Sequence, residues 1–506
     1  MLAKRINTPQ VSAFIAWSFL FTPALLHDSS WIAWILVPAS ALLIWPLTAT
    51  RIVLIPALIT LSLLGAINIF HIGFFGYLAD EFFIATALRS NQNEMKEFVQ
   101  TLPALQIAQV LAWCMAAFFA SKTIIRSRSH GSYTAPRTSY LCAMLIWAAL
   151  AAWGVSKKMD STTFFQKMHR VYPMHLVQAS FRHHEMEQGL FYNPLIPVQP
   201  PEHVLANTII VVLGESATAQ RWSLLGYQDA DTNAPLRNKA GVAVTQVRAE
   251  GPNTASALPF MLTGFSASES VVRQAASFID LAHHAGYKTF VFTNSRFNNQ
   301  QEDFYSLALR RSTDVYKKVG DGDFDEVLTP FLHTALSDTA EHKLIVLHTY
   351  GSHPGVNQRY PATRYQLPDP YDNSILYTSD LLEQWISIAQ QSNPSSSLLL
   401  YASDHGLVMP PLSQTYRTGD AQSTYEVPLL LWSGAPDASP LGALRTSLPT
   451  LGPGSNAVLQ QLAVRAMGYA PAMGSSESVI GHTSANVHHQ EAGSPAYEQL
   501  RLSTSD

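Results

Sequence analysis

The chain has 506 residues, of which only 13% are charged and 47% are hydrophobic. Soluble domains average roughly 25% charged residues, so this composition predicts a membrane part beside a more polar domain. The net charge is −4 and no basic stripe is present. Nucleic acid is therefore excluded as an expected partner, because binding a phosphate backbone requires clustered Lys and Arg. Both cysteines, Cys114 and Cys142, lie in apolar stretches, so the polar part of the chain can form no disulfide.

Long apolar segments occupy most of the first 155 residues. Each approaches the ~20 residues that a helix needs to cross the core of a bilayer. A cleaved signal peptide is disfavoured because one apolar segment leads directly into the next. Buried core helices of a soluble protein are also disfavoured, because three segments follow one another with only short linkers between them. We expect five transmembrane helices, at residues 9–26, 31–48, 52–75, 103–121 and 139–155.

Basic residues in the short loops predict the orientation of these spans. Lys4 and Arg5 precede the first span, Arg51 separates the second from the third, and four basic residues lie between the fourth and the fifth. Because positive loops stay in the cytoplasm, these segments are expected inside and everything after Val155 outside, in a bacterial periplasm. An enzyme in the periplasm has no access to cytosolic nucleotides. Its donor must already lie in the inner membrane or the envelope.

After the apolar segments, the composition of the chain changes twice, which predicts three further parts. A segment rich in Phe, His, Met and Pro predicts an interfacial connector, and a long α/β region follows it. The Ser-rich end predicts a disordered tail, where His482, His488 and His489 are better interpreted as solvated than as metal ligands. The expected parts are a transmembrane domain at 1–156, the connector at 157–203, a periplasmic catalytic domain at 204–473 and the tail at 474–506.

In the α/β region, short β-branched or Leu-rich runs alternate with helical stretches, which predicts a mainly parallel sheet. Ligands of such sheets collect outside the carboxyl ends of the strands. Four runs are followed by polar residues: Gly-Glu-Ser, Thr-Asn-Ser, a nearby Gly-Ser-His and Ser-Asp-His-Gly. The predicted strands are residues 208–213, 288–292, 343–348, 397–402 and 427–432.

The polar residues at these strand ends indicate a metal site. Glu215, Asp404 and His405 supply two carboxylates and an imidazole. A cluster of this kind without a thiolate suits Zn²⁺ or Mn²⁺, and a catalytic zinc needs about three protein ligands with one position open.

The segment EGPNTASALPFMLTG offers a nucleophile. Asn253 is a plausible N-cap, so Thr254 would begin a helix and project its hydroxyl beside free backbone N–H groups. The positive end of a helix stabilises an alkoxide or an incoming phosphate. From this segment alone, a nucleophile and a mere contribution to the cap are equally good interpretations of Thr254.

Five segments in order carry a family resemblance: NTIIVVLGESATAQRWSLLGYQDADTNAPL, GPNTASALPFMLTG, LHTYGSHPG, LLYASDHG and YEVPLLLW. With the preceding apolar spans, this set resembles the bacterial phosphoethanolamine transferases that modify lipid A or the lipopolysaccharide core. These enzymes belong to the alkaline phosphatase and sulfatase superfamily. The resemblance implies an alkaline-phosphatase-like α/β domain behind the helical bundle.

The resemblance also implies roles for individual residues. Glu215, Asp404 and His405 would bind zinc, and Thr254 would be the fourth ligand and the residue that becomes phosphorylated. 

Four further residues match family positions around the substrate. His353 would contact the phosphoryl group or a second zinc, and Asn294 would contact the substrate. Ser90 and Glu94 would hold the ethanolamine headgroup.

This sequence departs from the family pattern in two respects. No histidine occurs between His405 and His482, so a second zinc, or a histidine acid after Asp-His-Gly, stays open. Many relatives also have disulfides in the periplasmic domain, which this chain cannot form.

The resemblance implies transfer of phosphoethanolamine from phosphatidylethanolamine, through phosphorylated Thr254, to lipid A, a core heptose or a periplasmic glucan. A phosphoglycerol transferase of the lipoteichoic acid type and a membrane-anchored phosphodiesterase stay open as alternatives. A sulfatase is set aside because Thr-Ala-Ser-Ala-Leu stands where a Cys/Ser-x-Pro-x-Arg segment would be needed. An inactive sensor is disfavoured because the three expected zinc ligands are intact.

Overall fold

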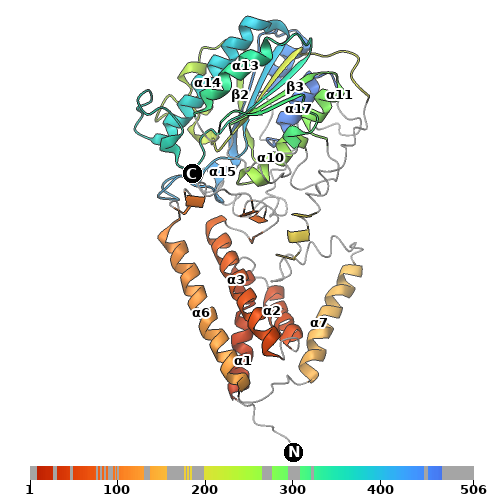
Figure 1. Cartoon of the computed structure of the whole chain (residues 1–506), viewed down its shortest axis with the longest axis vertical. Helices are drawn as coiled ribbons and strands as arrows, with labels where there is room; N and C mark the ends of the chain where they lie inside the picture. The colour runs from red at the N-terminus through yellow and green to blue at the C-terminus, as the bar shows by residue number, and fades with distance from the viewer. Residues whose placement is uncertain are drawn as a thin grey trace, which may run out of the picture. The chain divides into compact units, whose positions relative to one another are not determined.

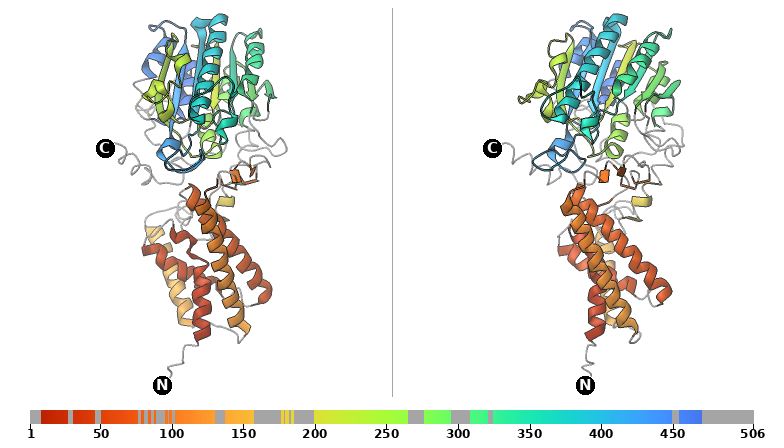
Figure 2. Two further views of the ribbon diagram at one scale, coloured as in Figure 1. Left: turned by 90° about the vertical axis from the view of Figure 1, so that its left-hand side faces the viewer. Right: turned by 60° about the vertical axis from the view of Figure 1, so that its left-hand side comes forward.

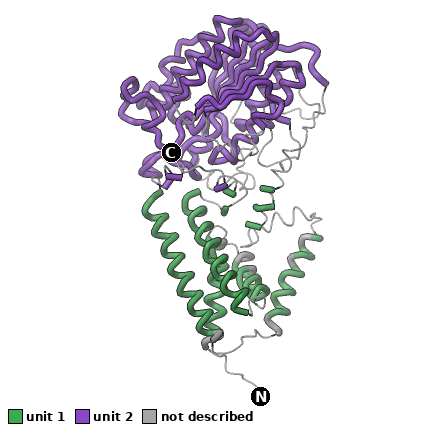
Figure 3. Tube along the Cα trace, viewed as in Figure 1, with its two compact units in different colours: residues 1–84, 102–184 green, residues 85–101, 185–506 purple. Residues whose placement is uncertain are grey.

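The computed structural model describes residues 8–26, 31–45, 50–75, 78–79, 83–84, 87–88, 95–96, 98–99, 102–129, 137–156, 176–177, 179–181, 183–184, 199–264, 276–294, 308–320, 324–448 and 454–469. The chain divides into two compact units, residues 1–84 with 102–184 and residues 85–101 with 185–506 (Figure 3). Ser90, Glu94, most of the expected connector and the whole expected tail, including its three histidines, lie outside the described residues. The domain boundaries expected from the sequence stay a prediction.

The first unit is helical, and each of the five apolar segments contains a helix (Figure 1). Of the described helices, two are long and apolar enough to cross a membrane, at Arg51–Phe75 and Ala104–Ser127. The first two helices have only 12 and 14 residues, and the apolar part of the last is Tyr140–Trp153. Five spans are therefore not confirmed. The elements are α1 (Thr8–Phe19), η1 (Thr22–Leu26), α2 (Trp31–Ile44), α3 (Arg51–Phe75), α6 (Ala104–Ser129) and α7 (Arg137–Ser156).

Two indole N–H groups form hydrogen bonds between helices of this unit, one from α1 to α2 and one from α6 to α3. Trp17 Nε1 donates to Ala41 O at 2.8 Å, and Trp113 Nε1 donates to Ser62 O at 2.9 Å. Buried apolar side chains pack between the helices, whereas many large apolar side chains of the same helices face outward. Those more than half exposed include Ile15, Ile52, Ile59, Leu63, Leu105, Leu111 and Phe118.

The second unit contains a seven-stranded sheet in the order β2-β7-β6-β1-β5-β3-β4. All five predicted runs form strands, and the expectation of a mainly parallel sheet is confirmed. The antiparallel member is β7, which runs against both of its neighbours, β6 and β2. The two strands that the sequence did not predict, β2 and β4, are the edges. The strands are β1 (Thr208–Gly214), β2 (Val242–Arg248), β3 (Lys288–Thr293), β4 (Val315–Lys318), β5 (Lys343–His348), β6 (Ser397–Ser403) and β7 (Glu426–Ser433).

Helices cover both faces of this sheet (Figures 1 and 2). One face packs against α13 and α14, and the other packs against α11 and α17, beside which α10 lies. The helices are α10 (Thr254–Thr263), α11 (Phe278–His284), α13 (Thr329–Leu336), α14 (Pro370–Ser392), α15 (Gln422–Tyr425), α16 (Pro440–Ser447) and α17 (Val458–Ala466). The short 3-10 helices are η4 (Ala219–Arg221), η5 (Ser223–Leu225), η6 (Ala234–Leu236), η7 (Asp325–Leu328), η8 (Val356–Gln358) and η9 (Pro394–Ser396).

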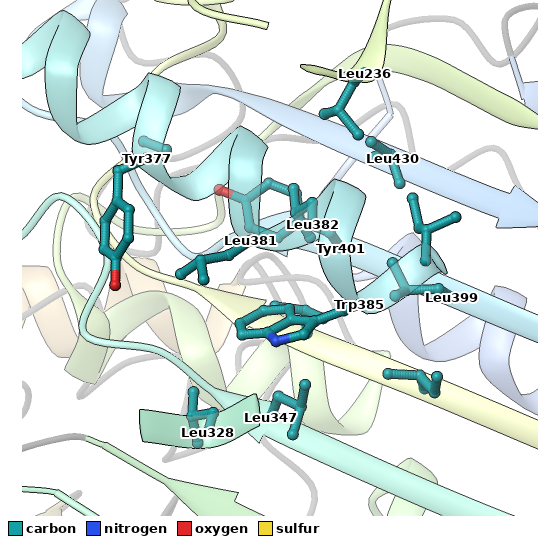
Figure 4. Packing of buried hydrophobic residues seen from close by; sticks show 14 of the residues in the cluster. Leu236, Leu328, Leu347, Tyr377, Leu381, Leu382, Trp385, Leu399, Tyr401 and Leu430 are labelled. Atoms are coloured by element: carbon teal, nitrogen blue, oxygen red, sulfur yellow. The ribbon is translucent and has the colours of Figure 1, made fainter. Parts of the chain in front are cut away.

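The alternation of side chains along the strands explains which residues form the core beneath α14. Successive side chains alternate between faces, so Leu399 and Tyr401 of β6 share the face on which α14 packs. Trp385 of α14 lies among Leu328, Leu347 and other buried side chains (Figure 4). Its Nε1 donates to Thr329 Oγ1 at 2.9 Å, which satisfies the one polar group that this indole buries. This packing fixes the strand ends that carry the candidate site.

Candidate metal centre and nucleophile

The carboxyl ends of the central strands lie in register. Gly214, which ends β1, is paired with Ser403, which ends β6, and Leu213 is paired with His348, which ends β5. Glu215 directly follows β1, and Asp404 and His405 directly follow β6. The predicted convergence of these strand ends is therefore confirmed.

Glu215, Asp404 and His405 form a buried cluster. One potential ligand atom of each lies within 4.8 Å of the other two. His405 Nε2 is 3.2 Å from Glu215 Oε1 and 3.6 Å from Asp404 Oδ2. All three side chains are buried, the last two almost completely.

The electrostatics of this cluster reflect two carboxylates that share one imidazole. Burial and the charge of Glu215 raise the pKa of Asp404 to about 7. Burial alone would also raise the pKa of Glu215, but the hydrogen bond and charge of His405, with smaller effects of His353 and Ser216, hold it well below its usual value. Burial alone would lower the pKa of His405, yet Asp404 and Glu215 raise it to about 9. The site therefore stabilises positive charge strongly.

These residues fit a divalent metal. Asp404 Oδ2 is buried and accepts no hydrogen bond from the described residues. His405 Nδ1 lies 2.7 Å from Gly406 O, so the proton of the neutral ring belongs on Nδ1 and the lone pair of Nε2 faces the two carboxylates. Metal-binding histidines are commonly oriented by this kind of hydrogen bond to a carbonyl. Two carboxylates and one imidazole also match the donor types of a catalytic zinc.

Thr254 is the first residue of α10, and its hydroxyl points at this cluster. Thr254 Oγ1 donates to Glu215 Oε2 at 2.9 Å and lies 3.5 Å from His405 Nε2. Asn253 is the N-cap, as the sequence predicts, because its side chain accepts from Ser256 N at 3.0 Å. The free N–H groups and positive end of α10 therefore lie beside the Thr254 hydroxyl.

Ser256 is the neighbouring hydroxyl that could compete with Thr254. It is fully buried and completes a capping box, in which its Oγ donates to Asn253 O at 3.0 Å and accepts from Asn253 N at 3.3 Å. The same Oγ lies where a Cβ on Gly251 would be. Ser256 thus shapes the start of α10, whereas Thr254 faces the cluster.

His353 lies in the loop that follows β5, and it is half-buried. Its ring stacks on Tyr350 with 4.6 Å between centroids, and the guanidinium of Arg359 covers the Tyr350 ring at 4.5 Å. Arg359 Nε also donates to His353 O at 3.2 Å. In the same loop Gly351 has φ +50°, and a Cβ there would come within 2.5 Å of Glu215 O, so glycine allows the loop to pack on the metal cluster.

Asn294 follows β3, as expected, but its side chain is fully buried. Its Nδ2 donates to Asp325 Oδ1 at 2.8 Å. Asp325 also accepts from Tyr350 N and Gly351 N, at 2.7 and 2.8 Å. In this structure Asn294 thus helps Asp325 to hold the His353 loop. Contact between Asn294 and a substrate stays a prediction.

Sequence reasoning missed three residues that hold the site. They are Asp325, Tyr371 and Asn456. Tyr371 Oη donates to Ser216 O at 2.6 Å, and Asn456 Nδ2 donates to Asp404 O at 2.9 Å. Each is a single polar residue far along the chain from its partner, so no local motif marks it.

Helices on both faces of a mainly parallel sheet, with a buried Glu-Asp-His cluster and a threonine that begins a helix at its carboxyl edge, define an alkaline-phosphatase-like domain. Comparison with known proteins agrees. Residues 207–439 match the sulfatase family, so the chain contains a sulfatase-family domain.

The chain is also similar to bacterial transferases, among them phosphoethanolamine transferases. The Escherichia coli K12 protein YhbX is 32% identical over 240 residues, which is 45% of this chain and 43% of YhbX. Phosphoethanolamine transferase EptC of that strain is 27% identical over 260 residues, 45% of each chain. Phosphoethanolamine transferase CptA of Salmonella typhimurium is 24% identical over 402 residues, 68% of this chain and 67% of CptA. The matches to YhbX and EptC thus span less than half of those relatives.

Two solved structures share the fold. The integral membrane phosphoethanolamine transferase EptA of Neisseria meningitidis superposes with a TM-score of 0.59 and 15% identity, covering 91% of this chain and 94% of EptA. The C-terminal periplasmic domain of Escherichia coli EptC, solved in complex with zinc, gives a TM-score of 0.52 and 22% identity, covering 60% of this chain and 98% of that domain.

Proposed function

We propose that this chain is a zinc-dependent phosphoethanolamine transferase of the bacterial inner membrane. It moves phosphoethanolamine from phosphatidylethanolamine to lipopolysaccharide, on lipid A or a core sugar, or to a periplasmic glucan. The observation that carries this proposal is the Thr254 hydroxyl, which lies at the start of α10, 2.9 Å from Glu215 Oε2 and 3.5 Å from His405 Nε2. The names of EptC, CptA and EptA support the transferred group.

Glu215, Asp404, His405 and Thr254 would hold the zinc. The unshared Oδ2 of Asp404 and the orientation of His405 support this assignment, as does the zinc complex of the EptC domain. When bound, zinc supplies Lewis acidity, which lowers the pKa of a coordinated hydroxyl and offsets the charge of phosphoryl oxygens. We propose one zinc, at the cluster that these residues form.

The reaction would take two displacements at phosphorus. Thr254 Oγ1 releases its proton toward Glu215 and forms a bond to the phosphorus of phosphatidylethanolamine, while the bond from phosphorus to the glycerol oxygen breaks. Diacylglycerol leaves with a proton. A hydroxyl or phosphate oxygen of the acceptor then attacks the same phosphorus, and Thr254 regains its proton. The N-terminus of α10 stabilises the phosphoryl oxygens in both steps.

His353 would contact the phosphoryl group and protonate the leaving oxygen, because its loop packs directly on Glu215. Asn294 is proposed to contact the substrate, and Ser90 and Glu94 the ethanolamine headgroup. The family resemblance supports these three assignments.

A membrane anchor suits a lipid donor. The outward apolar side chains of α3 and α6 support membrane insertion, since Ile52 is 86% and Leu105 is 68% exposed in the isolated chain. A water-facing surface of this kind is rare in soluble proteins. We propose five spans, a cytoplasmic N-terminus and a periplasmic catalytic domain.

Mass spectrometry of lipopolysaccharide and periplasmic glucans, from cells with and without this gene, tests the proposed activity. Glycolipid or glucan that carries phosphoethanolamine should appear only with the intact gene and be lost with Thr254→Ala. Identical spectra from all three strains would refute the proposal, and the modified species would identify the acceptor.

A further inference from the structure

Ser216 directly follows Glu215, which belongs to the metal cluster. The backbone conformation of Ser216 is unusual. Its φ is 59°, one of two positive φ values among the non-glycine residues that the structure describes. L-residues rarely adopt this left-handed region, and such residues concentrate at functional sites. Ser216 is also completely buried.

Every polar group of Ser216 has a partner at the metal cluster or directly behind it. The hydroxyl donates to Glu215 Oε1 at 2.6 Å, and the backbone N–H donates to Asp404 Oδ1 at 3.1 Å. The backbone carbonyl accepts from Tyr371 Oη at 2.6 Å, and Tyr371 Oη accepts from Thr218 N at 2.9 Å. Tyr371 thereby bridges the turn that contains Ser216.

These contacts are geometrically connected. The N–H points to Asp404 at the end of β6, and the left-handed φ sets the side chain relative to that N–H, so that the hydroxyl turns back toward Glu215. One residue thus binds both carboxylates, although Glu215 and Asp404 are 189 positions apart in the chain. Ser216 does not contact the second oxygen of either carboxylate. Glu215 Oε2 accepts from Thr254, and Asp404 Oδ2 accepts from no described residue.

We propose that Ser216 is the positioning residue that orients both carboxylate ligands of the metal centre. It acts through Glu215 and Asp404 and does not itself bind the metal. This inference rests on the proposed metal centre, and it adds a determinant of metal affinity and geometry to it. Hydrogen bonds to ligating carboxylates commonly change metal affinity by about 10–100-fold.

Two substitutions separate the hydroxyl from the backbone conformation. Ser216→Ala removes the bond to Glu215 Oε1, and Ser216→Gly also removes it but adopts a positive φ without steric cost. Ser397→Ala is a matched control, because this buried serine begins β6, at the opposite end of the strand from Asp404, and its hydroxyl donates to Asn393 O. Glu215→Gln is the reference for a lost ligand.

The test is titration of the full-length, metal-depleted protein with Co²⁺, followed by its visible absorption spectrum, and with Zn²⁺ in competition with a chelator. Ser216→Ala and Ser216→Gly should both weaken metal binding by about 10-fold or more and change the position or intensity of the Co²⁺ bands. Ser397→Ala should match the wild type in both, even where its thermal stability falls. These readouts do not depend on transferase activity.

A wild-type spectrum and affinity in both Ser216 variants would overturn the inference while leaving the metal centre intact. A spectral change in Ser216→Ala that Ser397→Ala shares would assign the effect to general destabilisation and also overturn it. A wild-type protein that binds neither metal would overturn the proposed metal centre together with this inference.

Discussion

Protons and a metal ion compete for the same side chains in this site. The pKa of Asp404 is raised to about 7 by burial and the charge of Glu215, and the pKa of His405 is raised to about 9 mainly by the two carboxylates. Near neutral pH the metal-free cluster therefore holds protons that a metal must displace. Glu215, whose pKa is lowered, stays ionised over this range.

Zinc affinity should therefore rise between about pH 6 and about pH 9, and zinc binding should release protons. The sign follows because raising the pH removes the competing protons from Asp404 first and His405 next. Calorimetry in two buffers with different protonation enthalpies measures the release directly. Asp404→Asn should lose the part of the pH dependence near pH 7. Affinity that does not change with pH would refute this arrangement of ligands.

Part of the site could be predicted from single residues. Glu215, Asp404 and His405 each directly follow a buried apolar run, and parallel strand ends must meet at one edge. Ser216, Asp325 and Tyr371 could not be predicted in this way. The role of Ser216 depends on its left-handed φ, and those of Asp325 and Tyr371 depend on loops and a helix whose approach is set by the tertiary fold.

At the scale of elements, the start of α10 links folding to the proposed chemistry. Asn253 caps this helix, and losing such a cap costs about 1 kcal/mol. Asn253→Ala should therefore speed amide exchange at residues 254–257 and lower phosphoryl transfer to Thr254, because the N–H groups there lose their fixed direction. Hydrogen exchange by mass spectrometry and a transfer assay on the same preparation check both effects.

Ser439→Ala is the control for that experiment. Ser439 caps α16 by accepting from Gly442 N at 3.0 Å, so its loss removes an equivalent cap elsewhere in the same unit. Transfer activity should then match the wild type. Equal losses of activity in Asn253→Ala and Ser439→Ala would show that α10 has no special role.

Burial determines which strands of the sheet can be predicted from the sequence. The five predicted strands are almost wholly buried, so they contain continuous apolar runs. The edge strands β2, with only three buried residues, and β4, which reads VYKK, contain no such run. β2 forms by pairing with β7, and β4 forms by pairing with β3. The residues of β2 and β4 alone do not predict this pairing.

At the scale of the whole molecule, the proposed orientation requires the two ends of α7 to lie on opposite sides of the membrane. A reporter that is active only outside the cytoplasm should be active when fused after residue 160 and silent when fused near Ser129. The reason is the cluster of basic residues at the end of α6 and the start of α7, Lys122, Arg126, Arg128 and Arg137, which we expect to stay in the cytoplasm. The reverse pattern would refute both the orientation and the outer-leaflet lipid donor.

The sequence indicated the helical first unit and the α/β second unit, because hydropathy and strand composition are properties of local segments. It did not establish the number of spans. Helices α1 and α2 have 12 and 14 residues, so apolar composition alone does not decide whether they cross a bilayer.

Trapping the covalent intermediate shows whether Thr254 carries the transferred group. The full-length protein, loaded with zinc and incubated with phosphatidylethanolamine but no acceptor, should gain one phosphoethanolamine group on the peptide that contains Thr254. Diacylglycerol should appear in equal amount. Thr254→Ala should lose both products, and Ser256→Ala should keep both, because Ser256 is buried in the capping box. A label on Ser256, or one that persists in Thr254→Ala, would refute Thr254 as the nucleophile, and a label of phosphoglycerol mass would replace the proposed donor.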